Sequence, residues 1–212
     1  MPKKAILYID ASGCEVKLAL SEDAVFAGGR VSAEAALESF CESFAELVPE
    51  PSKISLFAIC TGPGSMLGTR FASTFVSTVA SLTGAKIAEW NGMRAAAFAL
   101  SETRKVSEFS LFAPSKKGSA NILNFGGGNV EFEGEIDLSQ IGARAKQEKF
   151  LLFQRKNPPP EIANFKTVNL TPRQIFEVLE RRGELLSPCS APPDAKSFAN
   201  REYVKWKAQA RI

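Results

Sequence analysis

The chain has 212 residues, 45% of them hydrophobic and 23% charged, and its net charge is +3. This length and composition suit one large globular domain or two small ones and exclude a disordered chain, and the weak charge argues against a dedicated nucleic-acid-binding face. The sequence contains no histidine, which excludes Ser-His-Asp and Cys-His catalysis and metal sites built on imidazole.

Three predicted strands open the chain. The apolar run at residues 5–9 predicts a buried strand, and the alternation at 16–20 predicts a half-buried partner joined to it by a hairpin at 12–13. A short third strand is expected at 25–27, and the glycine pair at 28–29 is expected to lead the chain into a helix.

Two amphipathic helices flank the next strand. Apolar residues recur at helical spacing over 33–48 and again over 66–82. The continuous apolar run at 54–60 between them predicts a strand covered on both faces, as in α/β proteins. Gly-Pro-Gly-Ser at 62–65 then predicts a tight loop that joins this strand to the second helix.

This loop is the first candidate binding site. Unpaired amides at the start of the following helix favour an anion, yet no lysine follows Gly68 where a Walker loop has one. We therefore favour a structural turn over a phosphate site and expect no bound cofactor, with ATP and magnesium as the open alternative. The residues that could touch a ligand are Asp10, Ser12, Gly62, Gly64 and Ser65.

Carboxylates remain as candidates for catalysis. Asp10 ends the first predicted strand, while Glu89 and Asp137 are expected to be solvated surface groups. The cysteines show no C-x-x-C spacing and mostly lie in apolar patterns, so we expect reduced structural thiols and no metal site. These cysteines are Cys14, Cys41, Cys60 and Cys189.

The second half predicts a smaller sheet and one helix. The expected strands lie at residues 109–112, 120–125, 130–133 and 150–153. Glycines at 126–128 form the turn between the middle two. Thr171, Pro172 and Gln174 supply an N-cap, a first-turn proline and a capping-box glutamine, so a helix begins there and is expected to end at Gly183. Proline-rich stretches before and after this helix, at 157–160 and 187–193, are interpreted as stiff connectors.

The order of the first elements is typical of a ribonuclease-H-like core. Three antiparallel strands precede a helix, and parallel crossovers then lead to a strand at 86–88 and a helix at 94–100. Asp10-Ala11-Ser12, the Gly-Pro-Gly-Ser loop and Gly68-Thr69-Arg70 are similar to the TsaB (YeaZ) family, whose members usually read D-T-S and then G-P-G-S-F-T-G-x-R. Met66-Leu67 departs from the usual Phe-Thr.

The resemblance implies an α/β protein of the ribonuclease-H-like, actin-like ATPase fold. A mixed sheet with flanking helices is expected at 1–104, and a smaller, divergent α/β lobe at 105–212. The resemblance also implies a non-catalytic partner of a TsaD-type subunit in tRNA threonylcarbamoyladenosine synthesis, with a TsaE-type ATPase as a further partner and tRNA reached only through the complex. The protein is expected to be cytoplasmic, with no membrane contact, and to form a homodimer when alone.

The two helices at 33–48 and 66–82 are the expected partner surface. In the family, the corresponding helices pair with those of a second subunit. The second helix carries a ridge of small residues beside larger apolar ones, and the alternative is that these side chains pack on the chain's own sheet. The candidate interface residues are Gly68, Phe71, Ala72, Phe75, Val76, Val79 and Ala80, with Phe40 and Phe44 of the first helix.

Two other functions stay open. A nucleotide-dependent ATPase or kinase of the same fold would need acidic magnesium ligands and a second phosphate loop, for which the glycines at 126–128 are the candidate. A tRNA-binding module acting alone would need more basic surface than the chain carries. The basic segment at 201–211 is expected to form a solvated end, with a phosphate contact as its alternative.

Overall fold

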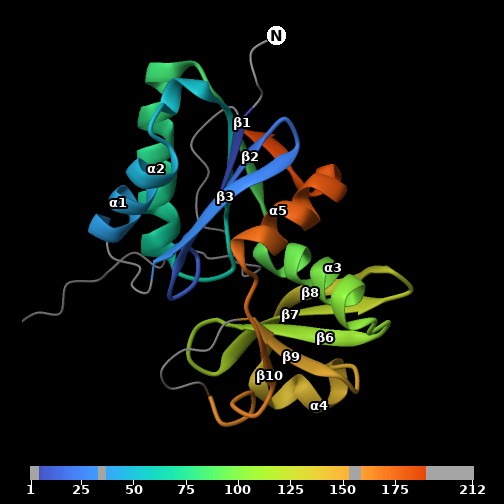
Figure 1. Cartoon of the computed structure of the whole chain (residues 1–212). Helices are drawn as coiled ribbons and strands as arrows, with labels where there is room; N and C mark the ends of the chain where they lie inside the picture. Colours follow the sequence, from blue (N-terminus) through green and yellow to red (C-terminus); the bar gives the residue numbers. More distant parts are fainter. Residues whose placement is uncertain (1–4, 33–36, 153–158, 190–212) are drawn as a thin grey trace, which may run out of the picture.

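The computed structural model describes residues 5–32, 37–152 and 159–189, which form two lobes, each built on a mixed sheet (Figure 1). The strands of the first sheet are β1 (Ala5–Asp10), β2 (Val16–Glu22), β3 (Val25–Ser32), β4 (Ile54–Cys60), β5 (Lys86–Trp90) and β11 (Ser187–Cys189). The strands of the second are β6 (Phe109–Pro114), β7 (Ser119–Gly126), β8 (Asn129–Asp137), β9 (Lys149–Leu152) and β10 (Lys166–Val168). The helices are α1 (Leu37–Leu47), α2 (Met66–Thr83), α3 (Gly92–Arg104), α4 (Ile141–Arg144) and α5 (Pro172–Arg181).

The first sheet has the order β11-β5-β4-β1-β2-β3. Strands β1, β2 and β3 run alternately up and down, and β4 and β5 continue parallel to β1. Strand β1 therefore stands between an antiparallel and a parallel neighbour. This topology confirms the predicted ribonuclease-H-like, actin-like fold.

Strand β3 extends through the glycine pair that was expected to end it. A Cβ on Gly29 would lie 2.6 Å from Cβ of Pro172, the first residue of α5, and a Cβ on Gly28 would lie 3.1 Å from Cδ1 of Leu47 in α1. The two glycines alternate between the faces of the strand. They therefore let α5 and α1 approach opposite faces of the strand instead of forming a turn.

Helices cover both faces of the first sheet. On one face, α1 and α2 pack over alternate residues of the central strands, with Leu7, Leu18 and Phe57 fully buried. On the other face, α3 and α5 cover Tyr8 and Ala58. This double coverage explains the continuous apolar character of β1 and β4.

The second sheet has the order β10-β9-β6-β7-β8. One face contacts α3, and the other buries a separate cluster that includes Phe112, Ile122 and Ile141 of α4. The predicted strands are confirmed, whereas β10 and α4 were not predicted. Both are short, at 3 and 4 residues, and carry too little periodicity to be recognised.

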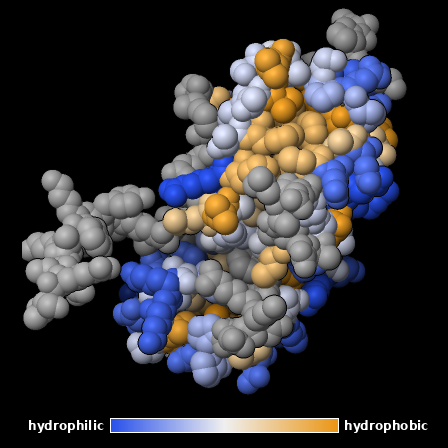
Figure 2. All heavy atoms as spheres, turned by 90° about the vertical axis from the view of Figure 1, so that its left-hand side faces the viewer, coloured by the Kyte–Doolittle hydropathy of each residue, from blue (hydrophilic) through white to orange (hydrophobic). Residues whose placement is uncertain are grey.

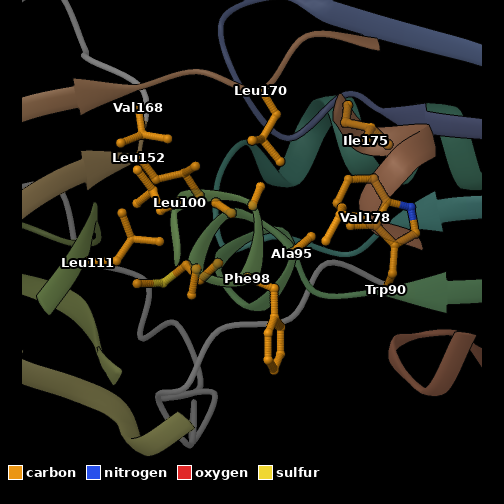
Figure 3. Packing of buried hydrophobic residues seen from close by; sticks show 14 of the residues in the cluster. Trp90, Ala95, Phe98, Leu100, Leu111, Leu152, Val168, Leu170, Ile175 and Val178 are labelled. Carbon is orange, nitrogen blue, oxygen red and sulfur yellow. The ribbon is translucent and has the colours of Figure 1, made fainter. Parts of the chain in front are cut away.

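Helix α3 joins the two lobes. Figure 3 shows side chains from both sheets and from α5 around it, among them Trp90, Leu111, Leu152 and Val178. Much of the α3 sequence is alanine, and Ala95, Ala96 and Ala97 are fully buried. These small side chains let elements of both lobes approach the helix closely.

The segment expected as a stiff connector at 187–193 begins with a strand. Residues Ser187–Cys189 form β11, which pairs antiparallel with β5, with Pro188 opposite Ala88. A proline is tolerated here because β11 is an edge strand. Helix α5 and β11 both follow residue 104, so the first lobe includes elements from both sides of the predicted division at 104 and 105.

Helix α5 begins with the predicted capping box. The Thr171 side chain accepts from the Gln174 amide, and the Gln174 side chain accepts from the Thr171 amide. The helix ends at Arg181, and Gly183 opens a short 3-10 turn rather than closing the helix. Residues 33–36 of the first predicted helix and the basic segment at 201–211 lie outside the described residues.

The four cysteines are free, but they differ in environment. Cys60 is buried and Cys189 partly buried, as expected for structural thiols, whereas Cys14 and Cys41 are exposed. All four are thiols, as predicted, but the apolar pattern around Cys41 did not predict that this residue would be exposed on α1. Among the described helices, none is both long enough and apolar enough to span a bilayer.

Candidate functional site

The candidate site lies at the carboxyl ends of β1, β4 and β5, where the first lobe meets the second. In open α/β sheets, ligands bind at this position. Three connections converge here: the β1–β2 turn, the loop at 61–65, and Asn91 at the start of α3. Asp10, Ser12, Gly62, Gly64 and Ser65 lie in the first two connections, so the fold places the predicted candidates in two neighbouring loops.

The glycines of the loop serve contacts between backbones. A Cβ on Gly64 would lie 2.1 Å from the carbonyl oxygen of Ser12, and a Cβ on Gly68 would lie 2.1 Å from that of Ala11. The amide of Ser65 also donates to the Ser12 carbonyl at 2.6 Å. The loop and the first turn of α2 are thus packed directly on the β1–β2 turn.

The N-terminus of α2 is capped from within the chain. The Ser65 hydroxyl accepts from the Gly68 amide at 3.1 Å, as an N-cap serine does. The carbonyl oxygens of Ala11 and Ser12 lie against the same turn. Since these oxygens carry partial negative charge, they disfavour an anion at the position where a phosphate would sit on a helix N-terminus.

Asp10 closes the β1–β2 turn. Its Oδ1 accepts from the Ser12 amide at 2.9 Å and from the Ser12 hydroxyl at 2.6 Å, which is the pattern of an Asx turn. The Cys60 sulfur lies 3.6 Å from the same hydroxyl. Burial raises the pKa of the Cys60 thiol, and the Asp10 carboxylate raises it further. The cysteine is therefore a neutral structural thiol rather than a nucleophile.

The described residues of the two lobes leave little space between them at this site. A cavity of about 20 Å³ remains, which is about the size that one water molecule needs. Its walls come from the first lobe (Asp10, Ser12, Gly13, Lys17, Trp90 and Gly92) and from the second (Leu152, Asn169 and Leu170). Ligand pockets for small molecules are typically 300–1,000 Å³. The cavity is therefore far smaller than a nucleotide requires.

Lys17 was not predicted as part of the site. It is 6% exposed, and its Nζ donates to Oδ1 of Asn169, which follows β10 in the second lobe. The Asn169 amide nitrogen in turn donates to Glu15 Oε2 at 3.1 Å. The alternation in β2 suggested an outward lysine, and no pattern in the sequence indicated that Asn169 would come beside it.

The other catalytic candidates lie apart from this cavity. Glu89 lies on β5 opposite Ser187 of β11, and Asp137 is an exposed residue at the end of β8. Gly127 and Gly128 have positive φ angles of 58° and 80° and form the hairpin turn between β7 and β8. No helix follows this turn, so the turn lacks the amide cluster of a phosphate loop.

The predicted partner surface divides into buried and accessible residues. Ala72 and Val76 are 0% exposed and Ala80 is 5%, and Phe40 and Phe44 are also buried in the core beneath α1 and α2. The ridge of small residues therefore faces the chain's own sheet, which is the alternative considered from the sequence. The remaining candidates are only partly buried: Gly68, Phe71, Phe75 and Val79.

The outer side of α2 carries exposed apolar residues at both ends and exposed polar residues between them. Leu67 is 81% exposed, Leu82 82% and Met66 36%. Phe71 and Phe75 lie between them along the helix, and their rings pack on Phe40, with centroid distances of 5.3 and 5.1 Å. Figure 2 shows apolar residues gathered on the side of the molecule that carries α1 and α2, flanked by hydrophilic ones.

A larger hollow of about 530 Å³ lies elsewhere, between α3, the β7–β8 turn and the end of α5. Its arginines already have partners within the chain. Arg94 forms a two-point ion pair with Glu133, at 2.8 and 2.5 Å. Arg182 stacks on Phe98 at 4.4 Å. Among the described residues, no group of three or more acidic or cysteine side chains is arranged to hold a metal.

Comparisons with known proteins find the same fold in solved structures. One is an uncharacterized protein with similarity to peptidase YeaZ from Pseudomonas aeruginosa, with a TM-score of 0.65 and 12% identity over 91% of this chain and 100% of that one. Another is YeaZ from Pseudomonas aeruginosa, with a TM-score of 0.63 and 14% identity over 85% of this chain and 94% of that one. No protein-family model and no curated protein matches the sequence. The chain thus shares the fold of YeaZ along most of its length.

Proposed function

We propose that this chain is a non-catalytic partner subunit of the TsaB type. It would bind a TsaD-type catalytic subunit in tRNA threonylcarbamoyladenosine synthesis and reach tRNA only through that complex. A TsaE-type ATPase is a further proposed partner, and the proposed location is the cytoplasm. The fold shared with YeaZ and the loop motifs at Asp10-Ala11-Ser12 and 62–65 support this proposal.

The observation that carries the proposal is the little space that the described residues leave between the lobes. A nucleotide-using enzyme of this fold needs a cleft that admits the nucleotide, whereas here Lys17, Trp90 and Leu152 leave about 20 Å³. The carbonyl oxygens of the β1–β2 turn also lie against the N-terminus of α2. A subunit that binds a partner and leaves the chemistry to it is consistent with both features.

The outer side of α2 is the proposed contact surface. Leu67 and Leu82 are more than 80% exposed at the two ends of α2, and the half-buried Phe71 and Phe75 lie between them beside exposed polar residues. A second helix pair packing here would bury Leu67, Phe71 and Leu82. The same surface would support a homodimer when the partner is absent.

The test is a pair of substitutions, Leu67→Arg and Leu82→Arg. Each places a charge on the proposed contact, so each should weaken association with a TsaD-type subunit, and self-association, by at least 10-fold, since a buried unpaired charge costs several kcal/mol. Light scattering and a pull-down measure the association. Both side chains are exposed, so the thermal midpoint should stay within about 2 °C of the parent.

Val25→Arg is the matched control. Val25 is 65% exposed but lies on the edge strand β3, and its substitution should leave association unchanged. Equal binding by the parent, Leu67→Arg and Leu82→Arg would contradict the proposed surface.

Deletion of the gene from its native organism tests the proposed pathway. The tRNA modification should be lost, and intact modification would contradict the proposal.

Calorimetry with ATP and magnesium tests the alternative of an ATPase or kinase. The filled cleft predicts no binding heat at millimolar nucleotide. Stoichiometric binding, or turnover by the isolated chain, would favour the alternative instead.

A further inference from the structure

Lys17 is a charged residue that is almost completely buried. Its side chain emerges from β2 into the space between the lobes, and only 6% of the residue is exposed. Burying an ammonium group is costly unless it is paired and hydrogen-bonded. A lysine at this position therefore needs an explanation from its contacts.

The contacts of Lys17 cross from one lobe to the other. Its Nζ donates to Oδ1 of Asn169, a residue 152 positions further along the chain. The Asn169 amide donates back across the cleft to Glu15 Oε2 at 3.1 Å. On the side of the first lobe, Asp10 stands directly opposite Lys17 in the β1–β2 register, so a carboxylate lies on the neighbouring strand.

The ammonium also lies where this fold binds ligands. The cavity that Lys17 lines is bounded by the ends of β1 and β5 in one lobe and by the end of β9 and the residues after β10 in the other. A ligand at such a position would touch both lobes and hold them together. In this chain Lys17, which extends from the first lobe, makes such a contact with Asn169 of the second lobe.

We propose that Lys17 is a built-in ligand. Its ammonium group occupies the cleft in place of a bound molecule and holds the two lobes in their closed arrangement. The closed arrangement is then a property of the sequence and needs no nucleotide or cation. The inference concerns the isolated chain and is independent of the proposed partner subunit.

Lys17→Ala removes the ammonium group and the methylene chain that carries it. Without them the cleft loses the hydrogen bond from Lys17 to Asn169, one of its contacts between the lobes, so the thermal midpoint should fall by about 5 °C or more, and the radius of gyration from small-angle X-ray scattering should rise. The cavity left by the substitution should accept a small organic cation. n-Butylammonium at tens of millimolar should therefore reverse at least half of the decrease in thermal midpoint. Tetraethylammonium, which is too bulky and has no N–H donor, should reverse none of it.

Lys86→Ala is the matched control, because Lys86 is an exposed lysine on β5, another strand of the same sheet. It should keep the parent midpoint and show no response to n-butylammonium. A Lys17→Ala chain with the midpoint and radius of the parent would overturn the proposal, as would an equal response of both variants to the amine. If Lys17→Ala does not fold, Asn169→Ala replaces it: a larger radius of gyration supports the proposal and an unchanged one overturns it.

Discussion

At the scale of single residues, the loop at 62–65 shows that a glycine-rich turn before a helix can pack against the backbone instead of binding a phosphate. Glycines before a helix permit phosphate binding because the backbone can approach the ligand closely. In this chain, Gly64 and Gly68 instead approach the carbonyl oxygens of Ser12 and Ala11. Sequence alone could predict the turn, but its use depends on the β1–β2 turn that lies beside it only in the folded chain.

Gly64→Ala should be strongly destabilising. The new Cβ would lie 2.1 Å from the Ser12 carbonyl oxygen, which is backbone and can move only with the β1–β2 turn. We expect a loss of about 2–3 kcal/mol in the free energy of unfolding, measured by urea titration. A Cβ on Gly142 meets nothing within 4 Å, so Gly142→Ala should be neutral or slightly stabilising. Equal stability of both variants would contradict the close packing.

At the scale of elements, periodicity predicted most of the first lobe because its helices and strands are long. It could not identify which side of α2 is buried, since this helix carries apolar side chains on more than one side. The small residues Ala72, Val76 and Ala80 suggested a close helix contact, and the contact is with the chain's own sheet. A sequence pattern shows that a side is apolar, whereas only the fold shows what covers it.

The side of α2 that faces the sheet should not tolerate a charge. Ala72→Arg and Val76→Arg would place a charge in the core beneath α2, so they should unfold the chain rather than prevent association. Circular dichroism should show loss of the cooperative thermal transition. A folded Ala72→Arg monomer would mean that this side of α2 is accessible.

Helix α5 gives a second element-scale prediction. Thr171 caps it, and Pro172 packs against Gly29 in the edge strand β3. Thr171→Ala should therefore cost about 1 kcal/mol of unfolding free energy in urea. Thr78→Ala is the control: this exposed threonine donates only to the Thr74 carbonyl of its own helix, and its loss should cost less than 0.5 kcal/mol by the usual range for surface sites. A smaller loss at Thr171 than at Thr78 would contradict the role of the cap.

At the scale of the whole molecule, the ends of the described chain are tied together. The Tyr8 hydroxyl on β1 donates to Glu180 Oε1 on α5 at 2.6 Å, across 172 positions, and Tyr8 is 1% exposed. Burial raises the pKa of Tyr8 above its usual range, and the bond to Glu180 raises it further. No local pattern could predict this pair, because its members lie on elements from opposite ends of the chain.

The raised pKa of Tyr8 predicts loss of stability at alkaline pH. In the unfolded chain a tyrosine ionises near pH 10, while the folded chain keeps the proton. Above pH 10 the unfolded state therefore binds fewer protons, and stability should fall by up to about 1.4 kcal/mol per pH unit from this group. Tyr8→Phe should be less stable at neutral pH but should show a smaller fall between pH 10 and 11. Parallel urea-derived curves for the two proteins would contradict this prediction.

The return of α5 and β11 to the first sheet also has a consequence for biosynthesis. Strand β5 ends at Trp90, but its neighbour β11 begins at Ser187, and the face that holds Tyr8 is only partly covered, by α3, until α5 has been made. Many two-lobed proteins fold their first half while the second is still being translated. Here the ribosome must first deliver nearly the entire described polypeptide before the first sheet can be completed, so the nascent first half should keep apolar surface exposed for longer.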